Sequence, residues 1–314
     1  MKILCIGQIV YDLTFSMNET IIENRKYVMK ERTECIGAPA TNAAALLAKW
    51  DCDTSLIARI GDDFLGKEIL DQLHKLNISI ETILIDPSVS TSISCILTNP
   101  GNGSRTIFNH PLRESHIEPK WPKEDPDFIL IDGRETEIAL QALKKYPCAT
   151  SVMDAGSVKP WTSTLAPLVD YFVCSEDLSR TYTGQEIDVQ DRNKLSAIFS
   201  KLAELNKKHI VITIGDRGVL YQENQKIHHI PAFKTKTVDS TGAGDIFHGA
   251  FVYFLGHNHP LETVIQLASL TASISTETMG GMISIPSLKE VMQRSKKNEV
   301  HILNYFSTIR IYPP

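Results

Sequence analysis

The sequence VDSTGAGDIFHGAF, residues 238–251, runs from an extended segment through a glycine turn into a helix. The helix is predicted because apolar residues recur at intervals of three and four from Phe247 to Leu255. Gly242 and Gly244 have no side chains to shield their amides, and the first amides of a helix have no partner within it. The turn is therefore predicted to attract anions.

A carboxylate, Asp245, follows the second glycine directly. Amides that hold phosphate charge, beside a carboxylate that accepts a hydroxyl proton, would suit phosphoryl transfer to an alcohol. Taken alone, however, Gly-Ala-Gly-Asp is more often an ordinary strand-to-helix turn. Two familiar phosphate loops are excluded: no Lys-Ser/Thr pair follows the second glycine, and Phe247 stands where a dinucleotide fingerprint needs its third glycine.

Composition narrows the class of protein. The 314 residues are 42% hydrophobic, enough for a large core in one α/β domain or in two smaller ones. A net charge of −5 without a basic run argues against a nucleic-acid partner. No apolar run approaches the roughly 20 residues that span a bilayer. Residues 1–10 are interpreted as a first strand, and the scattered cysteines, without a Cys-x-x-Cys pair, predict free thiols in the cytoplasm.

Strand and helix patterns alternate along most of the chain. Repeated strand–helix units predict an α/β fold with a mostly parallel sheet and helices on both faces. The predicted strands are 2–7, 54–60, 128–131, 150–153, 171–174 and 210–214, followed by a hairpin at 218–230. The predicted helices are 43–50, 65–76, 137–145, 193–205, 261–278 and 288–296.

Two segments interrupt this alternation. Residues 13–36 are polar with no clear helix, and residues 91–111 have the pattern of a hairpin around a glycine-rich loop. We expect these insertions to pair into a small sheet of their own. No linker separates independent domains, so a single domain over 1–314 is predicted. Its core would comprise 1–12, 37–90 and 112–314.

Three further motifs accompany the opening stretch. The four stretches read Gly-Ala-Pro-Ala-Thr-Asn at 37–42, Gly-Asp-Asp-Phe-Leu-Gly at 61–66, Thr-Ile-Gly-Asp-Arg-Gly at 213–218 and Asp-Ser-Thr-Gly-Ala-Gly-Asp at 239–245. In order and spacing they resemble the motifs of the ribokinase-like (PfkB) family of sugar and nucleoside kinases, over nearly the whole chain. The resemblance implies a three-layer sandwich with a β-sheet lid. It also implies ATP-dependent transfer of the γ-phosphate to a hydroxymethyl group of a sugar.

The resemblance implies roles at the reacting centre. Asp245 would be the catalytic base, which the helix dipole is expected to keep ionised. The anion hole would be formed by the amides of Gly242, Ala243 and Gly244. The sugar would be bound by Asp12, Gly37, Ala38 and Asn42. The nucleotide would be bound by Thr213, Gly215, Gly218 and Arg105.

Further roles concern cations and water. ATP and Mg²⁺ are the implied cofactors, and Asp239, Thr241 and Ser284 match positions that bind a monovalent cation such as K⁺. The lid, formed by 13–36 and 91–111, would exclude water and make a homodimer interface.

The sequence departs from the family pattern in two places. Ala38 replaces the second glycine of the first motif, which predicts a less close approach of backbone to sugar. Ser175 and Leu178 stand where the family has Asn-x-x-Glu, which organises Mg²⁺. Glu176 and Asp177 lie beside them, and the magnesium residues stay unassigned.

Finer details resemble the ketohexokinase and sulfofructose kinase branch of that family. These details lie at 26–28, 38–40, 103–107, 108–111 and 172–177. Lys26 and Asn109 lie in the two lid segments, and Arg134 follows a core strand. If they converge, they would suit a ketose-like substrate with an anionic group. The alternative is that Lys26 is a solvated charge and that Arg134 pairs with Glu135 or Glu137.

Two other functions stay open. A nucleoside kinase would need an apolar shelf for the base, which Phe15, Tyr27 and Phe108 of the lid would supply. A non-catalytic sugar or nucleotide sensor on the same fold is disfavoured by the intact run 242–245 and slightly favoured by the altered magnesium motif.

Overall fold

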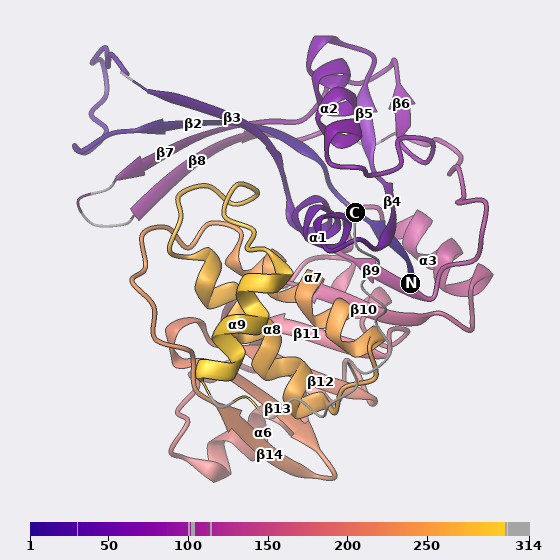
Figure 1. The fold of residues 1–314 in the computed structure, drawn as a ribbon, viewed down its shortest axis with the longest axis vertical. Helices are drawn as coiled ribbons and strands as arrows, with labels where there is room; N and C mark the ends of the chain where they lie inside the picture. The colour runs from indigo at the N-terminus through magenta and orange to yellow at the C-terminus, as the bar shows by residue number, and fades with distance from the viewer. Residues whose placement is uncertain (30, 100, 102–103, 114, 299, 301–314) are drawn as a thin grey trace.

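An eight-stranded sheet in the order β14-β13-β12-β11-β10-β9-β1-β4 forms the centre of the computed structural model (Figure 1). The structure describes residues 1–314 except 30, 100, 102–103, 114, 299 and 301–314. The strands from β4 to β12 pair in parallel, and β13 and β14 add antiparallel strands at one edge. The predicted α/β class with a mostly parallel sheet is confirmed.

The strands of this sheet are β1 (Lys2–Ile6), β4 (Asp53–Ile57), β9 (Phe128–Ile131), β10 (Thr150–Ala155), β11 (Tyr171–Ser175), β12 (His209–Thr213), β13 (Val219–Glu223) and β14 (Lys226–Ile230). The helices are α1 (Pro39–Lys49), α2 (Phe64–Lys75), α3 (Thr136–Lys145), α4 (Thr162–Leu165), α5 (Glu176–Thr183), α6 (Arg192–Leu202), α7 (Ala243–Gly256), α8 (Leu261–Ser275) and α9 (Leu288–Lys297). A short pair, β5 (Arg59–Gly61) and β6 (Leu84–Asp86), lies apart. Among the described residues, no helix is long and apolar enough to cross a membrane.

Helices cover both faces of the large sheet, and alternate side chains of each strand enter two different cores. Ile3 and Cys5 of β1 belong to the core shared with α1, α7 and α8. Leu4 and Ile6 belong to the core shared with α3, α5 and α6. Continuous apolar strands such as Phe128–Ile131 are therefore buried on both sides.

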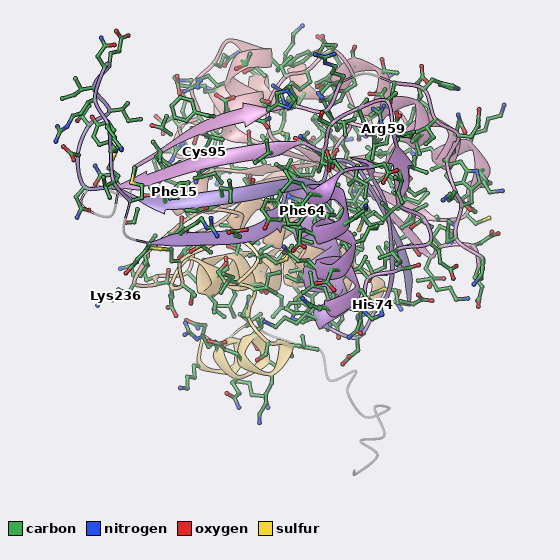
Figure 2. The ribbon with its side chains drawn as sticks, turned by 90° about the horizontal axis from the view of Figure 1, so that it is seen from above. Phe15, Arg59, Phe64, His74, Cys95 and Lys236 are labelled. Atoms are coloured by element: carbon green, nitrogen blue, oxygen red, sulfur yellow. The ribbon has the colours of Figure 1, made fainter. Side chains whose placement is uncertain are left out.

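The two insertions pair into a separate four-stranded sheet, as predicted. Its order is β3-β2-β7-β8. The strands are β2 (Val10–Ser16), β3 (Arg32–Gly37), β7 (Ile93–Asn99) and β8 (Ser104–His110). A parallel ladder between β2 and β7 joins the two insertions. Figure 2 shows the four strands side by side, with Phe15 and Cys95 on this small sheet.

Several predicted boundaries were wrong. The helix expected at 43–50 begins at Pro39. Proline is well suited to the first position of a helix, because the backbone amide that it lacks would have no partner within the helix there. The strand expected at 54–60 is split into β4 and β5 around Ala58. The short helices α4 and α5 were not predicted. Gly103 and the tail 301–314 lie outside the described residues.

Helices α1 and α7 pack closely because small residues face one another. A methyl group added at Gly249 of α7 would lie 3.0 Å from the carbonyl oxygen of Ala43 and 3.1 Å from its Cα atom. Asn42 precedes Ala43, and Asp245 lies one helical turn before Gly249. The close packing therefore brings these two polar residues together.

Replacing Gly249 with Val is expected to lower the free energy of unfolding by about 1–3 kcal/mol, because the backbone of α1 would have to move. The same change at Gly244 is the matched control: it lies in the same helix, and an added methyl group would meet nothing within 4 Å. Urea denaturation of both variants tests this, and equal stability would contradict the close packing.

Candidate active site

Three cavities surround the N-terminal end of α7. The α7–α8 cavity, of about 550 Å³, is lined by residues including Thr213, Gly215, Gly218, Phe233 and Gly244. The carboxylate cavity, of about 410 Å³, is lined by residues including Asn109, Arg134, Asp154, Gly244 and Asp245. The small-sheet cavity, of about 120 Å³, is lined by residues including Asp12, Gly37, Asn42, Asp239 and Thr241. Residues of three of the four predicted motifs thus gather at one end of the large sheet, whereas the motif at 61–66 lines none of these cavities.

The glycine turn has the geometry expected of an anion-binding helix start. Gly242 is the N-cap of α7 in the left-handed conformation, with φ of 75°. Gly244 is exposed, and the space where a side chain would lie is empty. The Ala243 amide donates to the carbonyl oxygen of Ser240 at 3.3 Å, a long bond that occupies this amide only weakly.

Asp245 is held by a residue from the other motif. The Asn42 amide nitrogen donates to Asp245 Oδ2 at 2.6 Å. Burial, with the nearby Asp154 charge, raises the pKa of Asp245, whereas the Asn42 bond and His248 lower it. Desolvation thus opposes the helix dipole, which is expected to keep this carboxylate ionised.

Three residues that the sequence analysis did not identify surround this contact: the half-buried Asp132, the buried Asp154 and the buried His248. Asp132 follows β9 and accepts the amides of Gln8 (2.8 Å), Ala40 (3.3 Å) and Arg134 (2.9 Å). Asp154 of β10 lies 3.1 Å from Nδ1 of His248 on α7. Burial raises the pKa of Asp154 to about 8. For Asp132 and Asp154, the only sequence signal of a functional role was their position near the carboxyl ends of apolar strands.

The first motif shapes the small-sheet cavity. A methyl group added at Gly37 would lie 2.2 Å from Asp12 Oδ2, so the glycine makes room for that carboxylate. Burial raises the pKa of Asp12 to about 6. Ala38 has φ of 95° and ψ of 157°, a conformation that almost only glycine adopts. The motif's missing glycine is therefore replaced by a strained alanine.

The nucleotide-side residues separate into two groups. Thr213, Gly215 and Gly218 line the α7–α8 cavity. Gly215 and Gly218 have φ of 62° and 104°, which glycine tolerates. Arg105 does not line this cavity. Its Nη1 donates to the Thr241 hydroxyl at 3.4 Å, and its charge helps to lower the pKa of Asp239.

The residues matched to a monovalent cation site lie around one turn. Asp239 Oδ1 accepts from the amide and hydroxyl of Thr241 at 2.9 and 2.7 Å, and its Oδ2 accepts the Gly280 amide at 2.9 Å. Ser284 donates to the carbonyl oxygen of Gly281 at 2.8 Å. No group of three or more His, Cys, Asp or Glu side chains in the described part of the chain is arranged to hold a metal ion.

The altered magnesium motif forms a helix cap. Ser175 Oγ accepts the Leu178 amide at 3.1 Å and donates to the carbonyl oxygen of Gly156 at 2.6 Å. Leu178 is fully buried. Glu176 pairs with Arg217, and Asp177 pairs with Arg180 at 2.6 Å. These four residues are engaged with protein groups, and none is arranged as a direct metal ligand.

The three residues considered for an anionic group do not all converge. Asn109 and Arg134 line the carboxylate cavity, whereas Lys26 is exposed on the loop between β2 and β3 and lines none of the three cavities. Arg134 Nη2 donates to the carbonyl oxygen of Leu112 at 3.0 Å. Glu135 pairs with Arg59 at 2.9 Å, and Glu137 lies 3.4 Å from His116.

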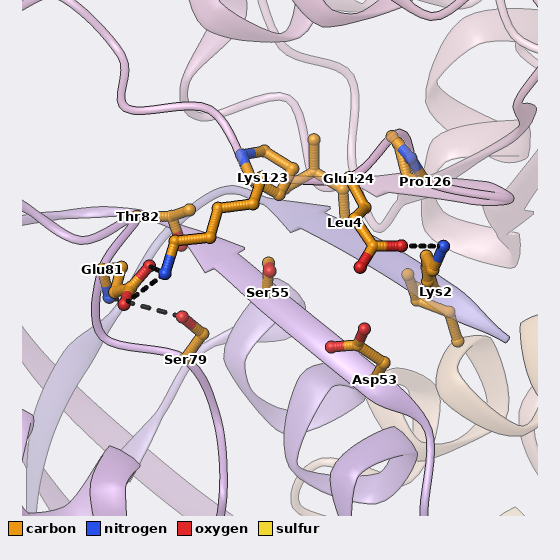
Figure 3. A pocket seen from close by; sticks show the side chains of 12 residues that line it. Lys2, Leu4, Asp53, Ser55, Ser79, Glu81, Thr82, Lys123, Glu124 and Pro126 are labelled. Atoms are coloured by element: carbon orange, nitrogen blue, oxygen red, sulfur yellow. Dashed lines mark hydrogen bonds and ion pairs between the residues drawn. The ribbon is translucent and has the colours of Figure 1, made fainter.

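A further hollow of about 190 Å³ lies at the amino ends of the strands, opposite to the end that carries the three cavities (Figure 3). It is lined by the first residues of β1 and β4, Lys2 and Asp53, and crossed by ion pairs such as Lys123–Glu81 at 3.0 Å. Ligands of open α/β sheets bind beyond the carboxyl ends of the strands. The hollow is at the amino ends and lacks every motif residue.

Comparisons with known proteins agree with the motifs. The pfkB family of carbohydrate kinases matches residues 1–288. A ribokinase from Lactococcus lactis is 24% identical over 96% of this chain and 99% of its own length. A nucleoside kinase from Methanocaldococcus jannaschii is 23% identical over 95% of this chain and 98% of its own. These relatives do not single out the ketohexokinase or sulfofructose kinase branch.

The fold also matches solved structures. Arabidopsis thaliana ribokinase, solved with ribose and ATP, superimposes with a TM-score of 0.76 at 20% identity, covering 93% of this chain and 97% of that one. The ribokinase-like architecture of the chain is thereby confirmed.

Ala38→Gly is expected to raise the free energy of unfolding by about 1 kcal/mol, because relief of the strained backbone outweighs the added freedom of glycine in the unfolded chain. Ala40→Gly, in the first turn of α1, is the matched control and should lower it by about 1 kcal/mol. Guanidinium denaturation measures both. A loss of stability in Ala38→Gly would show that the strain is absent.

Proposed function

This chain belongs to the pfkB family of carbohydrate kinases, and we propose that it transfers the γ-phosphate of ATP to a hydroxymethyl group of a ketose-like sugar. One observation carries the proposal: the stretch 239–245 borders all three cavities. Thr241 lines the small-sheet cavity, Gly244 the α7–α8 cavity and Asp245 the carboxylate cavity. A donor and an acceptor bound on its two sides would meet at the glycine turn.

ATP would occupy the α7–α8 cavity. The cavity's volume of about 550 Å³ and its apolar walls, which include Val219, Phe233 and Phe247, suit a purine nucleoside. The phosphates would then extend towards Gly244, which this cavity shares with the carboxylate cavity. Gly244 leaves the start of α7 open to an anion.

Asp245 would accept the proton of the sugar hydroxyl. Its bond with Asn42 fixes the carboxylate, and orientation matters more than basicity when the proton leaves late in a loose transition state. The pKa of Asp245 is raised to about 7, so the carboxylate becomes protonated and can no longer act as a base as the pH falls through this value. We therefore expect turnover to decline on the acid side. Asp12 and Gly37 would contact the other hydroxyls.

Mg²⁺ would neutralise phosphate charge when it arrives with ATP. Ser175 and Leu178 do not fit as its direct ligands, because one is a helix cap and the other is buried. For K⁺, the carboxylate of Asp239 and the hydroxyls of Thr241 and Ser284 supply oxygens of the kind a hard cation binds. We assign them to K⁺ as part of the proposal.

The small sheet would act as a lid over the sugar and exclude water. On its outer strand β8, Ile107 and Phe108 are 49% and 56% exposed to solvent. Exposed apolar side chains on an edge strand suit a homodimer formed through this sheet. All six cysteines are free, which suits a cytoplasmic protein.

An anionic group on the ketose is supported by two side chains of the carboxylate cavity. Arg134 and Asn109 line it together with Asp245. Lys26 would join them only if the loop between β2 and β3 closed over the cavity. A nucleoside is the second candidate, supported by relatives that include a nucleoside kinase and by the exposed ring of Phe108.

Asp245→Asn is expected to cut turnover by about 10²–10⁴-fold while leaving ATP binding largely intact, because only the proton acceptor is lost. Coupled ADP-release kinetics and nucleotide titration calorimetry measure the two effects. Asp71→Asn, on the exposed side of α2, is the control. Near-normal turnover of Asp245→Asn would remove the assignment of the base.

Arg134→Ala is expected to raise the KM for a ketose carrying a sulfonate or phosphate by about 10–100-fold, since a charged hydrogen bond is lost, with a much smaller effect on fructose or ribose. Lys26→Ala tests the second cation, and the exposed Arg113→Ala is the control. If neither Arg134→Ala nor Lys26→Ala alters any acceptor, the anionic-substrate proposal fails.

The same assay, run over sugars and nucleosides with and without K⁺, separates the remaining alternatives. Phosphorylation of nucleosides alone would favour the nucleoside kinase. No phosphorylation of any acceptor would favour a non-catalytic sensor.

A further inference from the structure

A buried aspartate–histidine pair lies next to Asp245 and has no part in the mechanism above. Asp154 comes from β10 and His248 from α7, and they are 8% and 4% exposed. Asp154 Oδ2 lies 3.1 Å from His248 Nδ1. His248 is one helical turn after Gly244, and it lines the carboxylate cavity together with Asp154 and Asp245.

Both ring nitrogens of His248 face acceptors. Nδ1 lies 2.7 Å from the carbonyl oxygen of Gly244, and Nε2 lies 3.3 Å from the carbonyl oxygen of Val173. A neutral imidazole has one N–H and cannot donate to both sides. No donor in the described part of the chain is aligned on Asp154 Oδ2, although this atom is buried. A proton shared between Asp154 and His248 would give Asp154 Oδ2 and His248 Nδ1 a hydrogen bond, whereas without this proton the buried oxygen has no partner.

The charge of this pair matters because the site is crowded with acids. The charged and titratable groups that line the cavity beside the pair are Asp132 and Arg134 after β9, Lys159 after β10, and Asp245 of α7, and Asp12 of β2 acts on Asp245. An ionised Asp154 without His248 would place a second carboxylate beside Asp245 and disfavour its ionisation. A cationic His248 has the opposite effect, so a pair sharing one proton presents no net charge.

We propose that Asp154 and His248 share one proton and act as a positioning pair that keeps Asp245 ionised and holds the Gly244 carbonyl. This carbonyl belongs to the peptide bond joining Gly244 to Asp245, so the pair fixes the backbone on which both the anion-binding turn and the base are carried. The inference rests on the proposed function, because it takes Asp245 as the base.

The test is the pH profile of kcat/KM, measured with the full chain. In His248→Gln, Asp154 no longer shares its proton and, because burial raises its pKa to about 8, it titrates in the same pH range as Asp245. The two carboxyls then compete for one negative charge, so the acid limb is expected to move to higher pH and turnover at neutral pH to fall about tenfold. The double variant Asp154→Asn with His248→Gln removes both charges, and its acid limb is expected to return towards the wild-type position. A merely structural role of His248 predicts that the double variant is at least as impaired.

His257→Gln is the matched control. His257 lies at the C-terminal end of the same helix, and its Nδ1 makes the same contact to the carbonyl one turn earlier, Tyr253, at 2.7 Å. It should leave the profile unchanged. An acid limb that stays in place in His248→Gln, or stays shifted in the double variant, would overturn the proposal.

Two measurements separate this inference from its premise and from misfolding. Asp245→Asn is run in the same assay: its full activity would remove the proposed base itself, whereas its inactivity with an unmoved limb in His248→Gln removes only the pair. If the variants do not fold, ¹⁵N NMR of the wild-type imidazole decides. Ring shifts of His248 that stay constant between pH 6 and 9 and lie between those of a neutral and a cationic imidazole support the shared proton. The shifts of a plain neutral imidazole, or an ordinary titration near pH 6.5, overturn it.

Discussion

The contact between Asn42 and Asp245 depends on how closely two helices approach, and the rest of the site depends on that contact. The 2.6 Å bond joins residues 203 positions apart in the sequence. It forms because Ala43, directly after Asn42, and Gly249, one helical turn after Asp245, let the backbones of α1 and α7 touch. A larger side chain at this crossing would separate the base from the residue that orients it. Packing in the core thus determines geometry at the cavity.

Two glycines serve carboxylates in the same way. A methyl group at Gly7 would lie 2.2 Å from the Asp132 carboxylate, and one at Gly37 would lie 2.2 Å from that of Asp12. In both cases the missing side chain admits an acid to a crowded strand end. Asp132 then accepts amides from the end of β1, the start of α1 and the end of β9, which joins three elements at one oxygen pair. The first motif glycine is explained by the protein's own carboxylate before any ligand is considered.

The parts of the fold that could be predicted from sequence are those with local signals. Apolar runs such as Phe128–Ile131 predict buried strands, and the turn at 242–245 predicts a helix start. Asp154 and His248 could not be identified, because their importance arises only when β10 and α7 meet. The desolvation of Asp245 could not be predicted for a related reason. A helix dipole can be inferred from local sequence, whereas desolvation depends on everything that surrounds the carboxylate. The loop geometry that leaves Lys26 exposed was likewise not encoded in any short pattern.

The strained Ala38 shows how this surrounding structure maintains the site. Its conformation is disfavoured, yet two hydrogen bonds fix the first turn of α1. The backbone amide of Asn42 donates to the Ala38 carbonyl at 2.9 Å, and the backbone amide of Ala40 donates to the Asp132 carboxylate. Strain of this kind persists only where neighbouring contacts over-determine the backbone. If Ala38 relaxed, the start of α1 would turn and Asn42 would move with it. The half-buried Asp132, whose pKa is raised by desolvation, therefore stabilises the one conformation in which Asn42 reaches Asp245.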